Sequence, residues 1–511
     1  MPFVSHPLIR PGTLQSRAYQ ESILGESLGK NMLCVLPTGL GKTNVAVLLA
    51  ACRLEKFPGS KVLVLAPTRP LANQNCSAFK RFLIIDPEQF QVITGMVKPS
   101  ERERLYREKK LIFATPQTIH NDLLEGRISM KDFSLLVTDE AHHSVGAYSY
   151  PFVAKHYLRD ADNPRILGLT ASPGGTKEKI EEICKNLGIE AVEIRTEKDG
   201  DVMPYIKEKE IGWVYVELPE SFLRIRKLLD SVYKSKISTL HKLGFIRGAR
   251  ISKKELLQLQ AKLMAGLKEG HKKSLFGISP CIQAVKLEHA IGLLETQGMP
   301  VLEKYWNKLR GDKSNTSRQL AANRDVQAAM LLTRELFESG SSHPKMSRLC
   351  SIVEEQFRQN PDSRIMIFAN YRESVKDIAS VLENIPGAKP VTLVGQKGGV
   401  SQKQQIESIR KYESGGFNCL VTTSIGEEGL DISEATLAIF YEGVSSAIRS
   451  IQRRGRVGRA KIGRVIILIT KDTRDEAYYW SSRRKERRMH QVLHAMKQGG
   501  RGTLLGFSGD R

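Results

Sequence analysis

The chain has 511 residues, more than a single hydrophobic core usually serves, so we expect two to four domains. With 41% hydrophobic and 26% charged residues, the composition excludes a largely disordered chain. The longest apolar run, residues 45–52, is too short to cross a membrane, the N-terminus lacks a signal-peptide core, and the seven cysteines form no C-x-x-C pair. We therefore expect a cytoplasmic protein without zinc ribbons or disulfides.

The net charge of +23 is unevenly distributed. Residues 221–340 carry 22 Lys/Arg against 10 Asp/Glu, a net of +12, and residues 481–511 carry 8 against 2, a net of +6. A surplus kept for solubility would be spread along the chain, whereas these two stretches hold 18 of the 23 excess charges. Such concentration favours a polyanionic partner, because each neutralised phosphate releases counterions.

From residue 31 to about 205, short apolar runs alternate with longer amphipathic segments. Alternating strands and helices predict a parallel sheet with right-handed crossovers, which we place in a first domain over residues 1–212. The runs show little internal alternation, as strands buried on both faces should, and they cover residues 31–36, 61–66, 111–114, 134–138 and 165–170.

No strand pattern is found from Pro219 to about Gly340. Residues 222–240 and 253–268 carry apolar side chains at three- and four-residue spacing, which is typical of amphipathic helices. Breaks follow at 270, 298–300 and 311–317. We therefore predict an all-helical, basic insertion over residues 213–340.

Strand–helix alternation resumes after the insertion and predicts a second parallel-sheet domain over residues 341–480. A basic and helical tail is expected over residues 481–511. The second set of strands is placed at 364–369, 391–394, 418–423, 437–441 and 464–470.

A glycine-rich loop joins the first strand to the helical stretch 44–54, the context of a phosphate-binding loop. Its backbone N–H groups would cradle phosphates, Lys42 would reach the β- and γ-phosphates, and the Thr43 hydroxyl would bind Mg²⁺. A glycine-rich turn without a ligand is the alternative, because Leu36 stands where the general motif has its first glycine. The expected nucleotide contacts are Pro37, Thr38, Gly39, Leu40, Gly41, Lys42 and Thr43.

The tetrapeptide Asp139-Glu140-Ala141-His142 directly follows the strand at 134–138. A carboxylate at the end of a buried strand is costly unless it meets a cation, so Asp139 is expected to hold Mg²⁺. Glu140 would polarise the attacking water. The same letters on a surface helix would be a chance match, but their position at a strand end favours ATP hydrolysis.

The order PTGxGKT, DEAH and Thr170-Ala171-Ser172 resembles that of superfamily 2 helicases. The resemblance implies an α/β fold with two RecA-like parallel-sheet domains and an all-helical insertion between them. It also implies that Arg17 and Gln20 contact adenine, and that Thr170 and Ser172 couple hydrolysis to domain movement. In the first domain, contacts to the nucleic-acid backbone are implied for Thr68, Arg69, Thr94, Gly95, Thr115 and Gln117.

Residues 452–459 hold four arginines in eight positions. A solvated basic helix is one interpretation, but cations placed at the developing charge accelerate phosphoryl transfer. The resemblance implies that Arg456 and Arg459 are arginine fingers and that Gln452 positions the water or the γ-phosphate. In the segment 422–432, and in the phrase VGQ at 394–396, it further implies nucleotide contacts by Gly429 and Asp431 and nucleic-acid contacts by Gly395, Gln396, Thr423 and Ser424.

Longer phrases narrow the resemblance to the archaeal Hef branch, the relatives of the Fanconi anaemia M translocase. The branch implies a DNA translocase that acts on forks and Holliday-type junctions. Hef usually continues into an XPF-type nuclease domain, but these residues contain no G-D-x-x-x-E-R-K-x-x-x-D cluster, so we predict no nuclease activity from them. The phrases are VGQ (394–396), SQKQQ (401–405), SIGEEGLDI (424–432), SSAIRSIQRRGRVGR (445–459) and TRDEAYYWSSRRKERRM (473–489).

The function predicted from the sequence is an ATP- and Mg²⁺-dependent DNA helicase or translocase for fork repair, nucleoid-associated in an archaeal-type cell. It would bind branched DNA through the backbone, with a sliding clamp or a separate nuclease as a candidate partner. An RNA-stimulated ATPase of the Dicer or RNA-sensor type stays open, because the motifs contact backbone. A non-catalytic DNA-binding scaffold is disfavoured, because Lys42, Asp139, Glu140, Arg456 and Arg459 are all present.

Overall fold

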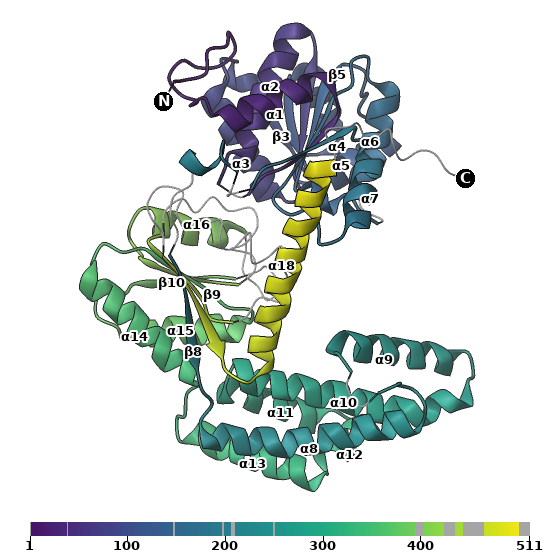
Figure 1. Cartoon of the computed structure of the whole chain (residues 1–511), viewed down its shortest axis with the longest axis vertical. Helices are drawn as coiled ribbons and strands as arrows, with labels where there is room; N and C mark the ends of the chain where they lie inside the picture. Colours follow the sequence, from purple (N-terminus) through teal and green to yellow (C-terminus); the bar gives the residue numbers. More distant parts are fainter. Residues whose placement is uncertain are drawn as a thin grey trace.

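The structure is a computed structural model that describes residues 2–37, 39–146, 149–196, 199–205, 210–248, 251–394, 402–423, 435–442 and 464–499. Two α/β domains and a bundle of helices are joined by one long helix, α18 (Arg474–Gly499), drawn in yellow in Figure 1. Within the described ranges, none of the helices combines the length and the apolar composition that a membrane crossing requires.

The first domain contains a seven-stranded sheet in the order β3-β4-β2-β5-β6-β1-β7, and every pair is parallel. In β1, Met32 and Cys34 face one hydrophobic core, whereas Leu33 and Val35 face another. Burial on both faces explains why these strands read as continuous apolar runs. The strands are β1 (Met32–Val35), β2 (Lys61–Leu65), β3 (Phe90–Ile93), β4 (Leu111–Ala114), β5 (Phe133–Asp139), β6 (Ile166–Thr170) and β7 (Ala191–Ile194).

Helices cover both faces of this sheet. One core receives side chains from α1 (Ala18–Gly29), α2 (Lys42–Lys56) and α3 (Arg69–Phe82). The core on the opposite face is formed with α4 (Pro99–Glu108), α5 (Pro116–Leu124), α6 (Ser149–Asp160) and α7 (Lys177–Leu187).

The second domain contains a six-stranded parallel sheet in the order β10-β11-β9-β12-β13-β8. Helices α14 (Pro344–Gln359) and α15 (Arg372–Leu382) pack on one face, and α16 (Gln402–Glu413) packs on the other. The strands are β8 (Glu210–Val216), β9 (Ile365–Phe368), β10 (Pro390–Leu393), β11 (Cys419–Thr422), β12 (Leu437–Phe440) and β13 (Arg464–Thr470).

Along the sequence, a bundle of helices follows β8 and precedes the other strands of the second sheet, so the predicted helical insertion is confirmed. Its larger core surrounds the fully buried Trp306, whose Nε1 donates to Thr333 Oγ1 at 3.2 Å. Ser252 and Glu255 cap the first turn of α9 reciprocally. The helices are α8 (Glu220–Lys242), α9 (Lys253–Lys268), α10 (Lys272–Thr296), α11 (Met299–Gly311), α12 (Asn315–Ala321) and α13 (Arg324–Glu338).

Two of the expected domain boundaries fall inside elements of the structure. Residue 213 lies within β8, which pairs with β13 along seven residues and so belongs to the second sheet. Residue 481 lies within α18, so the expected tail starts in the middle of a helix. Both corrections have one cause: each element is held in place by residues that are distant in sequence.

Candidate ATP- and nucleic-acid-binding site

The carboxyl ends of the strands in the first sheet gather the predicted motifs. Neighbouring strands β5, β6 and β1 end at Asp139, at Thr170 and before the phosphate loop. Strands β2, β4 and β3 form the other half of the same edge and precede Thr68, Thr115 and Thr94. Ligands of open parallel sheets bind along this edge. One half of the edge therefore carries the predicted nucleotide contacts, and the other half carries the predicted nucleic-acid contacts.

The phosphate loop needs its glycines. Gly39 and Gly41 have φ angles of 87° and 76°, a region in which other residues are strained. A Cβ atom at Gly41 would lie 2.5 Å from Gln20 Nε2. Lys42 is the first residue of α2, ahead of Thr43, and its Nζ donates to the Leu36 carbonyl at 3.2 Å. The loop thus delivers a lysine and the positive end of a helix to one place.

Gln20 connects α1 to this loop. Its side chain is 1% exposed, and its Nε2 donates to the Leu40 carbonyl at 3.0 Å. The Oε1 atom is buried and has no hydrogen-bond partner among the described residues. The Tyr19 hydroxyl donates to the same carbonyl at 2.7 Å and accepts from Arg17 at 3.1 Å, while the Arg17 guanidinium lies 5.2 Å from the ring centroid of Tyr205. The unsatisfied amide oxygen suits a ligand that donates, as the adenine amino group does.

Asp139 and Glu140 form a buried pair of carboxylates. Asp139 Oδ2 accepts from Asn75 Nδ2, and its Oδ1 accepts from the Glu140 N–H, both at 3.0 Å. Burial, and then the neighbouring Glu140, raise the pKa of Asp139 to about 6. Burial also acts to raise the pKa of Glu140, but the neighbouring His142 and the charge of Lys42 outweigh it and lower that pKa. A bound cation would relieve this crowding of negative charge.

A short series of contacts leads from Glu140 to the predicted coupling residues. The His142 Nδ1 atom lies 3.3 Å from Glu140 Oε2 and 3.2 Å from Thr170 Oγ1. Thr170 Oγ1 in turn accepts from the Ser172 N–H at 3.1 Å. Glu140 itself has a φ of 51°, a strained conformation of the kind that clusters at functional sites. The structure thus brings residues from β5 and β6 into one polar cluster.

Most of the predicted nucleic-acid contacts of the first domain lie where helices begin. Thr68 and Arg69 start α3, and Thr115 precedes α5. Of the others, Gly95 and Gln117 are exposed, whereas Thr94 is buried. Backbone N–H groups at the first turn of a helix favour phosphate. This arrangement suits binding of a sugar–phosphate backbone.

Asp122, which the sequence analysis did not single out, supports this half of the edge. Its carboxylate is fully buried and accepts from Arg102 at 2.8 Å through two nitrogens, from Arg127 at 3.0 Å and from the Tyr106 hydroxyl at 2.6 Å. Arg102 also donates to the Val97 carbonyl at 2.7 Å, just after the Thr94–Gly95 turn. One aspartate within a helical pattern gave no signal, because most of its partners lie 16 to 20 positions away.

Most of the predicted site residues of the second domain lie outside the described part of the chain. Thr423 is an exception: it follows β11, it is 7% exposed, and its N–H donates to the Leu393 carbonyl at 3.2 Å. Its role stays a prediction. The positions outside the described residues are Thr38 of the phosphate loop and Gly395, Gln396, Ser424, Gly429, Asp431, Gln452, Arg456 and Arg459 of the second domain.

The residues of the nucleotide half fit ATP and Mg²⁺. The left-handed glycines with Lys42 suit phosphates, and the unsatisfied Gln20 oxygen suits adenine. Thr43 and Asp139 are the residues that would hold the metal. ATP would supply the phosphoryl group, and the part left to the protein is positioning and charge stabilisation.

Three family models match successive parts of the chain. Residues 15–180 match the DEAD/DEAH box helicase, and residues 344–461 match the helicase conserved C-terminal domain. Residues 221–335 match the helical bundle of an ATP-dependent RNA helicase. The order of the three matches is the order of the two sheet domains and the insertion.

Known proteins resemble the chain over most of its length. A protein of Methanocaldococcus jannaschii, named as an ATP-dependent RNA helicase, is 44% identical over 97% of this chain and 63% of its own length. The ATP-dependent DNA helicase MPH1 of Pyricularia oryzae is 35% identical over 90% of this chain and 44% of its own length. The chain therefore spans less than two thirds of these curated relatives.

A solved structure matches on both sequence and fold. The Hef helicase domain of Pyrococcus furiosus is 45% identical, with a TM-score of 0.73, and the match covers 93% of this chain and 100% of that one. The chain belongs to the superfamily 2 DEAD/DEAH-box helicases of the Hef type, of which these residues are the helicase part.

Proposed function

We propose that this chain is an ATP-dependent DNA helicase or translocase that acts on branched DNA, such as stalled forks and Holliday-type junctions. The observation that carries the proposal is the strongly basic helical insertion, with a net charge of +12 over residues 221–340, attached to a superfamily 2 motor. Lys254, Lys262 and Lys272 are exposed on α9 and at the start of α10. A second basic surface allows one duplex arm to be held while the motor grips another.

The geometry of the first domain supports the proposed roles of its own site residues, whereas those of Arg456 and Arg459 rest on the resemblance to superfamily 2 helicases. Lys42 and the loop N–H groups bind the phosphates, Thr43 and Asp139 hold Mg²⁺, and Glu140 orients the attacking water. Arg456 and Arg459 complete the site from the second domain. Contacts at the starts of α3 and α5 then hold one strand by its backbone, without reading sequence.

An RNA-stimulated ATPase is the second candidate. It is favoured by the names of the helical-bundle family and of the Methanocaldococcus jannaschii relative. The DNA assignment is favoured by the name of the Pyricularia oryzae relative and by the likeness to the Hef helicase domain. A sliding clamp or a separate nuclease as partner, and association with the nucleoid, belong to the same proposal for DNA.

The first test is the steady-state ATPase rate without polynucleotide and with linear duplex DNA, forked DNA and double-stranded RNA, all at one salt concentration. Lys42→Ala and Glu140→Gln proteins serve as blanks. We expect forked DNA to stimulate most and both blanks to be inactive. Greater stimulation by RNA than by any DNA would overturn the DNA assignment and leave the motor assignment in place.

The second test concerns the insertion and uses variants matched in charge. Lys254→Glu with Lys262→Glu alters exposed side chains of α9, whereas Lys110→Glu with Lys131→Glu alters exposed lysines at the amino ends of β4 and β5, away from the proposed site. The first pair is expected to weaken forked-DNA binding about tenfold or more and to flatten its salt dependence, because lost phosphate contacts release fewer counterions. Equal effects from both pairs would show that weaker DNA binding comes from the loss of positive charge in general and not from the insertion in particular.

A further inference from the structure

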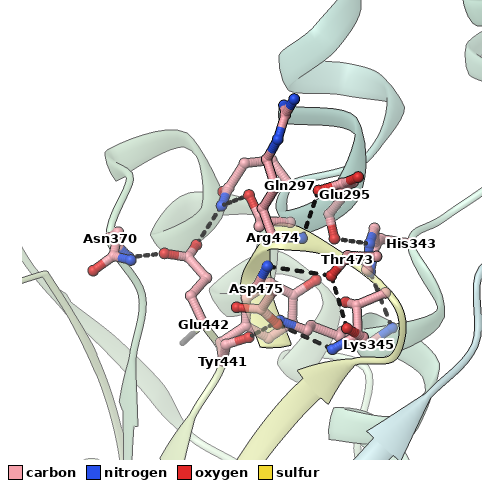
Figure 2. Close-up of polar contacts among 12 residues, drawn as sticks. Glu295, Gln297, His343, Lys345, Asn370, Tyr441, Glu442, Thr473, Arg474 and Asp475 are labelled. Carbon is pink, nitrogen blue, oxygen red and sulfur yellow. Dashed lines mark hydrogen bonds and ion pairs between the residues drawn. The ribbon is translucent and has the colours of Figure 1, made fainter. Parts of the chain in front are cut away.

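Helix α18 begins in a buried polar network of the second domain. Asp475 is 1% exposed, and its Oδ2 accepts from Lys345 Nζ at 2.5 Å and from the Thr470 N–H at 3.0 Å. Lys345 is fully buried and also donates to the Tyr441 carbonyl at 2.8 Å. Figure 2 shows these side chains converging at the start of the helix. A buried, paired charge fixes the direction in which α18 leaves the domain, because moving it would strand the partner charge.

The same end of α18 is bonded to the helical insertion. Arg474 donates from its backbone N–H to Glu295 Oε2 and from its guanidinium to the Glu288 carbonyl, both at 2.9 Å, and it pairs with the Glu288 carboxylate at 2.9 Å. Glu295 also pairs with Arg226 of α8 at 3.0 Å, and Arg226 donates to the Asp472 carbonyl at 2.8 Å. The first turn of α18 is therefore held by both the insertion and the second domain (Figure 2).

The other half of α18 packs on the first domain. Met489 and Leu493 are each 2% exposed and belong to the hydrophobic core between the first sheet and α4 to α7. At the rise of an α-helix, its 26 residues span about 39 Å, which takes it from the insertion to the first domain, as Figure 1 shows. A single unbroken helix thus crosses from one motor domain to the other.

Where it reaches the first domain, α18 touches the coupling motif. The Ser172 hydroxyl donates to the Met489 sulfur at 2.9 Å, and both groups are buried. The Ser172 N–H is hydrogen-bonded to the Thr170 hydroxyl, which is hydrogen-bonded to His142, and His142 lies beside Glu140. The polar contacts that start at Glu140 therefore end on a side chain whose helix is anchored in the other domain.

We propose that Met489 is a positioning residue for ATP hydrolysis: α18 carries it from the insertion and the second domain to the Ser172 hydroxyl, and so couples their movement to residues 170–172. A rotation of the second domain relative to the first must bend α18 or shift Met489 against Ser172. The proposal rests on the ATPase activity of the motor and not on the preference for branched DNA.

A methionine that merely fills the core is the alternative, and substitutions at one position separate the two. Met489→Leu keeps an apolar side chain of similar volume but removes the sulfur acceptor. Met489→Gln supplies an oxygen acceptor at similar length but buries an amide. Leu493→Ala is the matched control, because Leu493 lies one helical turn further along α18, is buried in the same core and has no hydrogen-bonding group in its side chain.

The test measures kcat and KM for ATP, with and without polynucleotide, beside the melting temperature of each variant. Met489→Leu is expected to melt near the wild-type temperature and to lose about fivefold in kcat with KM unchanged, the effect of one lost hydrogen bond. Met489→Gln is expected to melt lower yet to keep more of kcat. Leu493→Ala is expected to melt lower without a selective loss of kcat. Rates that follow melting temperature across all three variants would overturn the proposal.

A double-mutant cycle with Ser172→Ala localises the effect. If the hydroxyl and the sulfur act together, the double variant loses no more kcat than either single variant, about fivefold instead of the roughly 25-fold product. Independent multiplication of the two losses would contradict the proposal. Because the cycle is also read on the basal ATPase rate, its outcome is distinct from the failure of forked DNA to stimulate, which would count against the proposed function alone.

Discussion

Asn75 donates a hydrogen bond of 3.0 Å to Asp139, and so ties the predicted metal-binding carboxylate to the middle of α3. The same helix begins with Thr68 and Arg69, two of the predicted nucleic-acid contacts. Both side chains of the hydrogen bond are buried. This hydrogen bond therefore connects the half of the sheet edge with the predicted nucleotide contacts to the half with the predicted nucleic-acid contacts. Asn75 and the start of α3 are separated by about two turns of the helix.

Replacing Asn75 with alanine should lower kcat for ATP about fivefold, because the buried carboxylate of Asp139 loses a donor that fixes its orientation. We also expect weaker stimulation by polynucleotide, since α3 loses its tie to the site. Steady-state ATPase assays measure both. Asn73→Ala is the control, because Asn73 is an exposed asparagine of the same helix; an equal loss there would trace the effect to the helix as a whole.

Gln20 is expected to select adenine through its unsatisfied Oε1 atom. The variant Gln20→Ala should raise KM for ATP about tenfold, since an unmet donor on the base costs binding, while KM for GTP changes little. Each nucleotide is the control for the other in a single ATPase and GTPase series. Parallel increases for both nucleotides would mean that Gln20 only supports the loop carbonyl of Leu40.

His343 should make stability fall in acid. Burial, and then the charge of Lys345, lower the pKa of His343 to about 3. Its Nδ1 accepts from the Lys345 N–H at 3.2 Å, which caps α14 and requires the neutral ring. The unfolded chain binds a proton near pH 6.5 and the folded chain does not. The contribution of the neutral His343 to the free energy of unfolding is therefore fully present above about pH 6.5. It is lost as the pH falls towards 3, by up to about 1.4 kcal/mol per pH unit.

Thermal melts at pH 7.5 and pH 5 check this prediction. His343→Asn keeps a residue that caps helices well, so its melting temperature should depend less on pH than that of the wild type. His241→Asn, at an exposed position on α8, should leave the pH dependence unchanged. A wild-type slope that survives in His343→Asn would assign the acid sensitivity to other groups.

For the buried pair of Lys345 and Asp475, removing the lysine alone should cost more stability than removing both charges. Lys345→Met leaves Asp475 buried without its cation and is expected to cost about 3 to 5 kcal/mol of unfolding free energy. Adding Asp475→Asn should recover a large part of that loss, because the stranded charge is removed. Denaturant titration of the three proteins measures the difference; a double variant less stable than Lys345→Met would show that hydrogen bonds to Asp475 outweigh its charge.

The strands that the sequence analysis missed share one property. β3, β7 and β8 all lie at edges of their sheets, whereas the interior strands of both sheets were found. An edge strand packs less completely, and Gln91 in β3 and Glu193 in β7 interrupt the apolar runs. In β8 the exposed Trp213 and Tyr215 alternate with less exposed positions. A search for strands buried on both faces selects against such segments.

The motifs of the first domain were predictable because each couples local sequence to local structure. A strand that ends in a glycine-rich loop, or in two acidic residues, predicts a phosphate- or metal-binding site from about ten residues of sequence. Asn75 and Asp122 were not predictable in this way, since their partners Asp139 and Arg102 lie 64 and 20 positions away. Side chains of this kind acquire a role only when packing brings their partners to them.

The sequence by itself determined that the chain has two parallel-sheet domains and a basic helical insertion, and it predicted a nucleotide site at Lys42, Asp139 and Glu140, because these follow from periodicity, charge and short motifs. Only the tertiary structure decided that β8 joins the second sheet and that α18 crosses to the first domain to meet Ser172. Strand partners and helix packing at long sequence separation depend on the complementary surfaces of the folded domains, which no local pattern encodes.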